Sequence, residues 1–435
     1  MTGSPDVVIV GMGYVGLTIA STLASLDINV WGYERQPEIV SQLNEGHSHL
    51  YEPGIDDILQ SKIGKSLVVE DHLPESFGGI FILCVSTPIG PDKSPDLRNL
   101  RAASTSVAEC AEEGAMVIVR STVPVGTCRT VVLPALQEKM PSVQLASCPE
   151  RTIQGQALTE LRNLPQVVGG LDEASTNRAK KLWEQVTQQV ITVSSLEAAE
   201  MVKLINNSHT DLLYSFGNEI AFMAQGLDLD PMEVIHAANV DYPRPNLARP
   251  GFVGGPCISK DPYILLDSVK DTGYTPQLVA GARELNESLP QSVAQHFIDR
   301  LKACAGDDLT GSKILVCGFA YKGWPVTDDT RDAPADPILG YFKQHSLQIF
   351  GHDPMVPAER IKDSGATPVK DVSSGFEAAT GVLFINEHPD YRQLEIGKLV
   401  KSMKSPAAVY DCWRMFDRES VEVVPGIRYS GIGYG

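Results

Sequence analysis

The sequence predicts an α/β protein built from two doubly wound parallel-sheet domains, with an all-helical segment between them. Short apolar runs alternate with helix-like stretches in the first part of the chain, and the same alternation returns after residue 305. In between, residues 196–239 and 276–304 carry apolar residues at helical spacing over long stretches. We therefore expect three domains, at residues 1–195, 196–305 and 306–435.

The strands of both domains are predicted from apolar runs of the length that buried parallel strands have. In the first domain these runs are residues 7–10, 28–33, 80–85, 115–120 and 143–147, and in the last they are 313–317, 347–350, 381–385 and 407–410. A chain of 435 residues is also too long for one ordinary core. Residues 240–262 are rich in Pro and Gly and are expected to form a long loop, whose Cys, Lys and Asp residues indicate a functional role.

The net charge argues against some binding partners, and the cysteine spacing argues against metal sites and disulfides. With 36 Lys and Arg against 54 Asp and Glu, the net charge is -18, which argues against nucleic acid and anionic membrane as partners. The eight cysteines form no C-x-x-C pair, so neither a metal site nor a disulfide framework is expected. Because no leader-like N-terminus and no run of about 20 apolar residues is present, we expect a cytoplasmic protein.

A glycine-rich turn after the first strand predicts dinucleotide binding. Gly11 allows the tight turn, Gly13 lets a pyrophosphate approach the backbone, and Gly16 permits close packing of the helix on the strand. The helix N-terminus then stabilises the phosphate charge. Glu34 ends the next strand, where it binds ribose hydroxyls and repels a 2′-phosphate, so NAD is favoured; the adjacent Arg35 complicates that preference. The remaining motif residues expected at the cofactor are Tyr14 and Val15.

Cys257 is the candidate nucleophile of the long loop. It follows Gly254-Gly255-Pro256, where the glycines allow close packing around a ligand, and a nearby Lys260 is expected to stabilise the thiolate. The alternative is a buried structural cysteine, which fits Cys84 and Cys317 better because both lie in apolar strand-like runs.

Seven motifs in order along the chain resemble the UDP-glucose/GDP-mannose dehydrogenase family, from the first strand to about Phe416. They are GMGYVG (11–16), CVSTP (84–88), STVPVGT (121–127), PE (149–150), EMVKLINN (200–207), FVGGPCISKD (252–261), and FAYKG (319–323) with DDTRDAP (328–334). The resemblance implies an N-terminal NAD-binding Rossmann domain, a helical dimerisation segment and a Rossmann-like C-terminal domain that binds the UDP-sugar.

The resemblance also implies a chemistry. NAD oxidises the C6 alcohol of a nucleotide sugar to an aldehyde, Cys257 adds to it, and a second oxidation gives a thioester that is hydrolysed to the acid. Lys203 and Asn207 are four residues apart, so one helix face would present both to the developing oxyanion. Glu150 would act on thioester hydrolysis, and Asp261 and Thr122 would position the water.

Further residues acquire expected roles from the same resemblance. Thr87, Thr122, Lys260 and Arg331 would contact NAD, and Arg244 would reach into the partner subunit's site, which requires a homodimer. The expected contacts of the sugar nucleotide are Glu150, Arg151, Lys203, Asn207, Arg244, Gly254 and Lys322. No metal is expected.

The motif details favour an acetamido sugar. Pro149-Glu150-Arg151 and residues 164–170 (LPQVVGG) resemble the branch that oxidises UDP-N-acetylmannosamine or UDP-N-acetylglucosamine. That branch commonly has His where Pro256 stands, and Lys260 is more similar to the UDP-glucose branch, so a UDP-glucose 6-dehydrogenase is the main competing function. Two further functions share the same first domain: an inactive dinucleotide-binding regulator, and a 2-hydroxyacid dehydrogenase that uses a catalytic His instead of the thiol.

Overall fold

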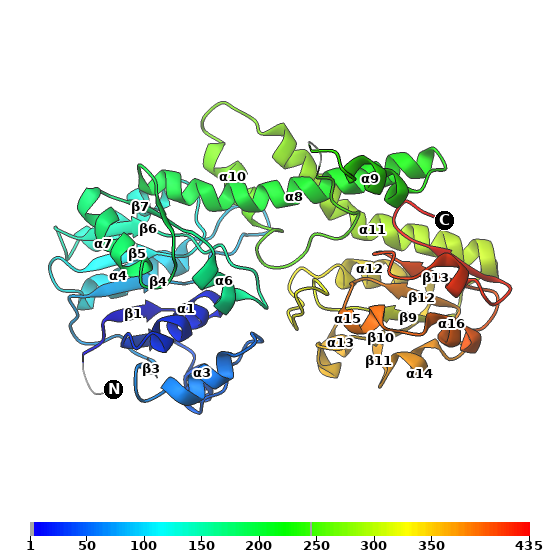
Figure 1. The fold of residues 1–435 in the computed structure, drawn as a ribbon, viewed down its shortest axis with the longest axis horizontal. Coiled ribbons are helices and arrows are strands. Elements are labelled where there is room, and N and C mark those ends of the chain that lie inside the picture. The colour runs from blue at the N-terminus through cyan, green and yellow to red at the C-terminus, as the bar shows by residue number, and fades with distance from the viewer. Residues whose placement is uncertain (1–3, 244–245) are drawn as a thin grey trace. The chain divides into compact units, whose positions relative to one another are not determined.

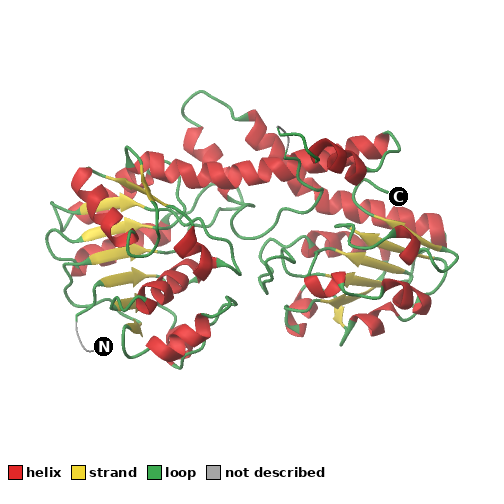
Figure 2. Cartoon of the chain, viewed as in Figure 1, coloured by secondary structure: helices red, strands yellow, loops and turns green. Residues whose placement is uncertain are grey.

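The computed structural model describes residues 4–243 and 246–435, which form two compact units. The first unit comprises the chain up to Asn207 together with residues 260–275, and the second comprises 208–259 and 276–435. Each unit holds one sheet with helices on both of its faces (Figures 1 and 2). The predicted fold class, two Rossmann-like α/β domains with a helical segment between them in the chain, is confirmed.

The first sheet has the strand order β3-β2-β1-β4-β5-β6-β7-β8 and is parallel except where β7 runs antiparallel to β6. The winding direction reverses between β1 and β4, which is where such sheets bind ligands beyond the carboxyl ends of the strands. Its strands are β1 (Val7–Val10), β2 (Val30–Tyr33), β3 (Leu67–Glu70), β4 (Ile80–Leu83), β5 (Met116–Val119), β6 (Gln144–Ser147), β7 (Gln166–Gly170) and β8 (Val190–Thr192).

Strand β1 shows why the sheet strands are continuously apolar. Val7 and Ile9 join one core cluster with helix α1, while Val8 and Val10 join the cluster on the opposite face with helix α4. Both faces are therefore covered and no polar alternation is needed.

The helices of this unit are α1 (Tyr14–Ser25), α2 (Pro37–Asn44), α3 (Ile55–Lys62), α4 (Arg98–Cys110), a π-helix (Cys128–Val132), α5 (Leu133–Gln137), α6 (Ala157–Asn163), α7 (Glu173–Trp183) and α10 (Asp261–Val269).

The second sheet is wholly parallel, with the order β11-β10-β9-β12-β13-β14. Helices α11 and α12 pack on one face and the shorter helices α14 to α17 on the other. The strands are β9 (Lys313–Cys317), β10 (Gln348–His352), β11 (Thr367–Pro368), β12 (Gly381–Phe384), β13 (Ala407–Asp411) and β14 (Ile427–Ser430). The helices are α9 (Pro231–Asn239), α11 (Gln277–Ala305), α12 (Ala335–Phe342), α13 (Ala358–Asp363), α14 (Val372–Phe376), α15 (Pro389–Arg392), α16 (Ile396–Leu399) and α17 (Arg418–Val421), with 3-10 turns at Lys343–His345 and Val400–Ser402.

Helix α8 (Leu196–Gly226) begins in the first unit and ends in the second, and both its buried and its exposed residues include polar and apolar side chains. Its buried stripe includes the polar residues Glu200, Lys203, Asp211, Ser215 and Asn218. Its exposed residues include the large apolar side chains of Met201, Ile205, Phe216, Phe222 and Met223. The polar side chains that the helix buries therefore need partners within the chain, whereas these five large apolar side chains lie on the surface.

No helix in the described part of the chain combines the length and the apolarity that crossing a membrane requires.

Candidate active site

The glycine turn after β1 has the geometry of a pyrophosphate site. Gly11 adopts a positive φ of 94°, and a Cβ added at Gly16 would lie 1.8 Å from the Gly11 carbonyl oxygen, so only glycine fits there. A Cβ added at Gly13 would meet no atom within 4 Å, and no side chain caps the helix at this residue. The N–H groups of the first turn of α1 are thus left for a ligand, as dinucleotide binding requires.

Glu34 lies at the carboxyl end of β2, beside this turn. Its Oε2 accepts a hydrogen bond from Met12 N at 3.1 Å and its Oε1 one from Gln36 N at 3.2 Å. The carboxylate is buried and oriented at the edge of the sheet where a ribose would lie, and Arg35 is exposed. The residues present therefore fit an NAD-type dinucleotide.

The hydroxyl of Tyr14 is hydrogen-bonded to a neighbouring carboxylate. It donates a hydrogen bond to Glu52 Oε2, and Gly155 N donates to the same oxygen at 2.7 Å. Burial and the adjacent Glu52 raise the pKa of Tyr14 far above its ordinary value, so the phenol stays protonated. Tyr14 thus ties the glycine turn to the loop that follows Glu150, and its backbone, rather than its hydroxyl, faces the cofactor site.

The loops after β4 and β5 meet at the same edge of the first sheet. Thr87 Oγ1 donates a hydrogen bond to the Thr122 carbonyl oxygen at 2.5 Å, and Ser121 Oγ donates to Val85 O at 2.6 Å. These contacts bring together Thr87 and Thr122, the two threonines that the sequence places at NAD.

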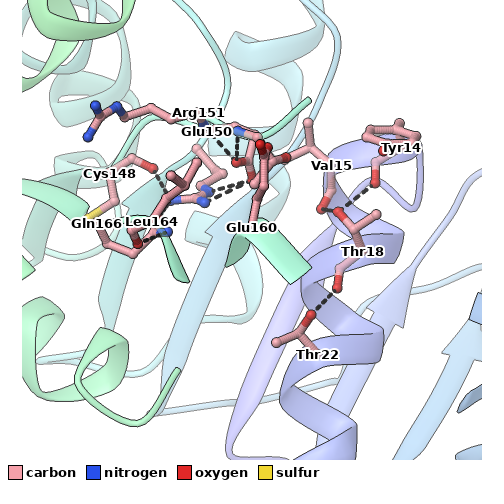
Figure 3. A network of polar contacts seen from close by, with 12 residues as sticks. Tyr14, Val15, Thr18, Thr22, Cys148, Glu150, Arg151, Glu160, Leu164 and Gln166 are labelled. Carbon is pink, nitrogen blue, oxygen red and sulfur yellow. Dashed lines mark hydrogen bonds and ion pairs between the residues drawn. The ribbon is translucent and has the colours of Figure 1, made fainter. Parts of the chain in front are cut away.

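Glu150 follows β6 and is held by Arg120, which directly follows β5. Arg120 is fully buried, donates from Nη2 to Glu150 Oε2 at 2.8 Å, and stacks on the Trp183 ring at 4.4 Å. Its Nη1 donates to Cys148 O and Gln166 Oε1 (Figure 3). Burial alone would raise the pKa of Glu150, but Arg120 and the backbone N–H groups of residues 151 and 152 outweigh it and lower that pKa. Glu150 is therefore ionised and fixed.

A chain of polar contacts links helix α8 to the start of α10 within the first unit. Lys203, itself buried, donates from Nζ to Asn207 Oδ1 at 3.4 Å. Asn207 Nδ2 donates to Asp261 Oδ2 at 2.5 Å, and Lys260 Nζ donates to Asp261 Oδ1 at 2.8 Å. Asp261 has no exposed surface. The i, i+4 pair and the catalytic-loop aspartate that the sequence singled out are thus brought into one hydrogen-bonded row.

Glu200, one turn before Lys203, anchors α8 to the loop after β5. Its Oε2 accepts from Gly126 N at 2.6 Å and its Oε1 from Cys128 N at 2.7 Å. One turn earlier still, Glu197 pairs with Arg129 at 2.6 Å. The register of α8 on the first sheet is set by these contacts, and with it the position of Lys203.

Cys257 lies in the second unit and is the exposed cysteine among the described residues. Gly255 has a φ of 87°, and a Cβ there would lie 2.6 Å from the Tyr321 ring, so the backbone before the thiol packs directly on that ring. Ser259 Oγ donates to Asp332 Oδ2 at 2.8 Å. By contrast, burial raises the pKa of the thiols of Cys84, Cys128, Cys148, Cys317 and Cys412.

Arg331 is a cation of this unit that interacts electrostatically with Cys257. The pKa of Arg331 is raised chiefly by its hydrogen bond to Asp329 and, among smaller contributions, by Cys257. Lys260, which the sequence assigned to the thiolate, is paired with Asp261 in the first unit. Lys322 lies with its Nζ 5.4 Å from the Tyr321 ring centroid.

Comparison with known proteins places the whole chain in one family. Three profiles of that family match, described as the NAD binding domain (residues 5–187), the central domain (197–288) and the UDP binding domain (315–418). A UDP-N-acetyl-D-mannosamine dehydrogenase of Pyrococcus horikoshii is 32% identical over 99% of each chain. The chain belongs to the UDP-glucose/GDP-mannose dehydrogenase family. The resemblance read from the sequence is confirmed, and the chain is an NAD-dependent nucleotide-sugar dehydrogenase.

Other relatives and solved structures of this family agree with that placement. A UDP-N-acetyl-D-mannosamine dehydrogenase of Campylobacter jejuni is 30% identical over 91% of this chain and 98% of its own. The solved UDP-D-ManNAc dehydrogenase of Pyrococcus horikoshii superposes with a TM-score of 0.88 at 29% identity, covering 98% of this chain and 99% of that one. A UDP-glucose dehydrogenase of Pyrobaculum islandicum gives a TM-score of 0.85 at 26% identity, covering 100% and 99%.

Within this family member, the first unit collects most of the expected site residues. It holds the glycine turn, Glu34, Thr87, Thr122, Glu150, Arg151, Lys203, Asn207, Lys260 and Asp261, and the second unit holds Gly254, Cys257, Lys322 and Arg331. Arg244 lies outside the described residues. Sequence reasoning missed Arg120 because it reads as the polar end of an apolar run. It missed the role of Glu200 because the N–H groups that this residue accepts from, those of Gly126 and Cys128, lie far away in the sequence.

Proposed function

We propose that this dehydrogenase oxidises the C6 alcohol of UDP-N-acetylmannosamine or UDP-N-acetylglucosamine to the carboxylate, through a thioester on Cys257. The observation that carries the mechanism is the hydrogen-bonded row Lys203–Asn207–Asp261, in which Lys203 and Asp261 are buried and which offers a cation and an amide donor on one face of α8. The relatives named as UDP-N-acetyl-D-mannosamine dehydrogenases support the acetamido sugar.

The reaction removes four electrons from C6. When bound, NAD accepts a hydride in each of the two oxidations. The alcohol loses its proton and a hydride to give the aldehyde; the Cys257 thiolate adds to C6, and the resulting alkoxide takes up a proton to form a thiohemiacetal. Loss of that proton and a second hydride gives the thioester, which water cleaves to the acid, releasing the thiolate.

Lys203 and Asn207 stabilise the negative charge that develops on the C6 oxygen. Lys203 is buried, where a cation interacts more strongly with a developing alkoxide than in water, and Asn207 donates from its amide. Asp261 accepts from Asn207 and so fixes which way the amide points. This orientation is preorganised, because α8 and α10 supply all three residues.

Glu150 and Thr122 act on the hydrolysis of the thioester. A carboxylate must be ionised to accept a proton from water, and Arg120 lowers the pKa of Glu150 sufficiently to keep it so. Thr122 follows β5 on the same sheet edge and orients the water with Asp261. Thr87, Glu34, Arg35, Lys260 and Arg331 are proposed NAD contacts, and Arg151, Gly254 and Lys322 are proposed sugar-nucleotide contacts.

Substrate screening tests the proposal directly. The protein is incubated with NAD and either UDP-N-acetylmannosamine, UDP-N-acetylglucosamine or UDP-glucose, and NADH and acid are both quantified. We expect two NADH per acid and the highest kcat/KM with UDP-N-acetylmannosamine. Fastest turnover of UDP-glucose would establish a UDP-glucose 6-dehydrogenase instead, and one NADH per oxidised product would contradict the covalent mechanism.

We also propose a homodimer formed through α8 and α9. The large apolar side chains exposed on α8 are followed along the chain by exposed Leu227, Leu229 and Val234, and exposed apolar surface of this kind is typical of an interface. Light scattering during size exclusion measures the oligomeric state; a monomer with full activity in dilute solution would contradict the dimer. The trans-acting role of Arg244, the three domain limits and a cytoplasmic location remain predictions from the sequence.

A further inference from the structure

Four buried polar residues of α8 and α11 form a continuous network in the second unit. Asn286 Nδ2 donates to Asp211 Oδ1 at 2.8 Å, and Arg283 Nε pairs with Asp211 Oδ2 at 3.4 Å. Asn218 Nδ2 donates to Asn286 Oδ1 at 3.0 Å. All four side chains are at most 2% exposed. A buried ion pair is costly to desolvate, so its retention needs a reason beyond stability.

The network ends on the backbone of the loop that carries Cys257. Asn218 Oδ1 accepts from Gly251 N at 2.8 Å, and its Nδ2 also donates to Gly251 O at 3.0 Å. Arg283 Nη1 donates to the carbonyl oxygen of Ile258 at 3.0 Å. The two anchored residues bracket the segment 252–257, and Ile258 is the residue next to the thiol.

This segment has no strand or helix to hold it in place. Buried backbone groups outside regular structure need side-chain partners, and here the two helices supply them. Cys257 itself is exposed, and the anchors on its neighbours help to fix the backbone that carries it. A small displacement of a nucleophile lowers the rate of the bond-forming step strongly.

We propose that the Asp211–Arg283–Asn286–Asn218 network positions the Cys257 thiol for attack on the aldehyde. The inference rests on the proposed function, in which Cys257 is the nucleophile. Arg283 acts as a positioning residue through Ile258, and it touches neither substrate nor cofactor. Because the first oxidation needs no thiol, loosening the loop should slow capture of the aldehyde and the second oxidation while leaving the first oxidation intact.

The test is rapid-mixing measurement of NADH formation with saturating UDP-N-acetylmannosamine and NAD. Two variants are compared, Arg283→Lys and the double variant Asp211→Leu/Arg283→Met, which removes both buried charges together and so preserves folding. Arg300→Lys on the same helix is the matched control, since Arg300 contacts His296 and not the loop. Semicarbazide is added to trap free aldehyde.

We expect the first NADH to form at the parent rate and the second to form at least about tenfold more slowly in both variants, since misplacement of reacting groups carries penalties of this order or greater. Aldehyde should become trappable, while the KM values and the Arg300→Lys control stay unchanged. Equal slowing of both oxidations, or two unaltered oxidations in a folded double variant, would overturn the proposal. Acid production by Cys257→Ala would instead overturn the proposed function itself.

Discussion

The two sheets share the strand order of a doubly wound fold, yet their first loops differ. Gly11 follows β1 and Gly318 follows β9, both with positive φ, at 94° and 105°. In the first sheet, helix α1 begins at Tyr14, immediately after the glycine turn. In the second sheet, helix α12 begins only at Ala335, so no helix N-terminus follows the turn directly. Of these two turns, therefore, the one in the first sheet presents a helix N-terminus suited to a pyrophosphate.

The acidic residues that follow the second strands of the two sheets also differ, in how many backbone hydrogen bonds they accept. Glu34 follows β2 and accepts one backbone hydrogen bond on each oxygen, so it keeps acceptor capacity for ribose hydroxyls. Asp353 follows β10 and accepts four backbone hydrogen bonds, from the N–H groups of Phe319, Ala320, Met355 and Val356. The two sheets thus have the same topology, but the carboxylate after the second strand can accept from a cofactor in the first unit and holds loops together in the second. This difference agrees with the match of the first unit to an NAD binding profile and of the second to a UDP binding profile.

In the proposed mechanism, the second unit supplies the nucleophile, Cys257. Cys257→Ser should lower acid production by about 10³-fold or more, because an oxygen ester is a poorer acyl donor than a thioester. A covalent sugar adduct on the introduced serine should appear in intact-protein mass spectra. NAD binding, a property of the first unit, should be unchanged.

Cys304→Ser serves as the control, since Cys304 is a partly buried thiol whose pKa burial raises. It should keep full acid production. Near-normal acid production by Cys257→Ser would remove the covalent step and with it this contrast between the units.

Two neighbouring glycines of the first turn allow the cofactor role to be separated from the fold. Gly16→Ala places a Cβ against the Gly11 carbonyl oxygen and should destabilise the protein by about 3 kcal/mol, the upper range for overpacking. Gly13→Ala meets no protein atom, so it should preserve the melting temperature and raise the KM for NAD about tenfold, equivalent to about 1.4 kcal/mol of binding. An unchanged KM in Gly13→Ala would show that the phosphates lie elsewhere.

How far the sequence predicts this site depends on whether the signal is local. Strands β1, β4, β5 and β9 are predictable because both faces are buried and the runs are apolar, whereas β7 escapes prediction because QVVGG reads as a glycine turn. The pairing of Lys203 with Asn207 follows from their helical spacing. The Arg120–Glu150 ion pair spans 30 residues and joins two strand ends, so no local pattern signals it.

Substitution of Glu34 and of Asp353 by their amides tests the difference between the two carboxylates that follow the second strands. Glu34→Gln should raise the KM for NAD several-fold and relax discrimination against NADP, because the neutral amide no longer repels a 2′-phosphate. Asp353→Asn should leave both constants unchanged and destabilise the protein by about 2 kcal/mol, since a charged acceptor of four N–H groups is weakened. Equal activity of the parent protein with NADP and NAD would show that Glu34 does not select the cofactor.

The smallest expected effect concerns how the stability of the protein depends on pH, because Arg120 lowers the pKa of Glu150 in the first unit. The pKa of Glu150 in the folded protein lies below its ordinary value of 4.5, because Arg120 and backbone N–H groups outweigh the effect of burial. A lowered pKa means that the ionised carboxylate contributes stability above pH 4.5, and that this contribution is lost as pH falls through the lower, folded-state value.

Glu150→Gln keeps the shape and lacks the charge, so the parent protein should melt at a higher temperature than this variant at neutral pH. The gap should stay constant down to about pH 5 and narrow below the ordinary glutamate value of about 4.3 to 4.5. Differential scanning calorimetry of both proteins across this range measures the gap, and Glu109→Gln, at an exposed position of α4, controls for the general effect of acid. A gap that widens as the pH falls would mean that burial governs Glu150 and that Arg120 does not hold it ionised.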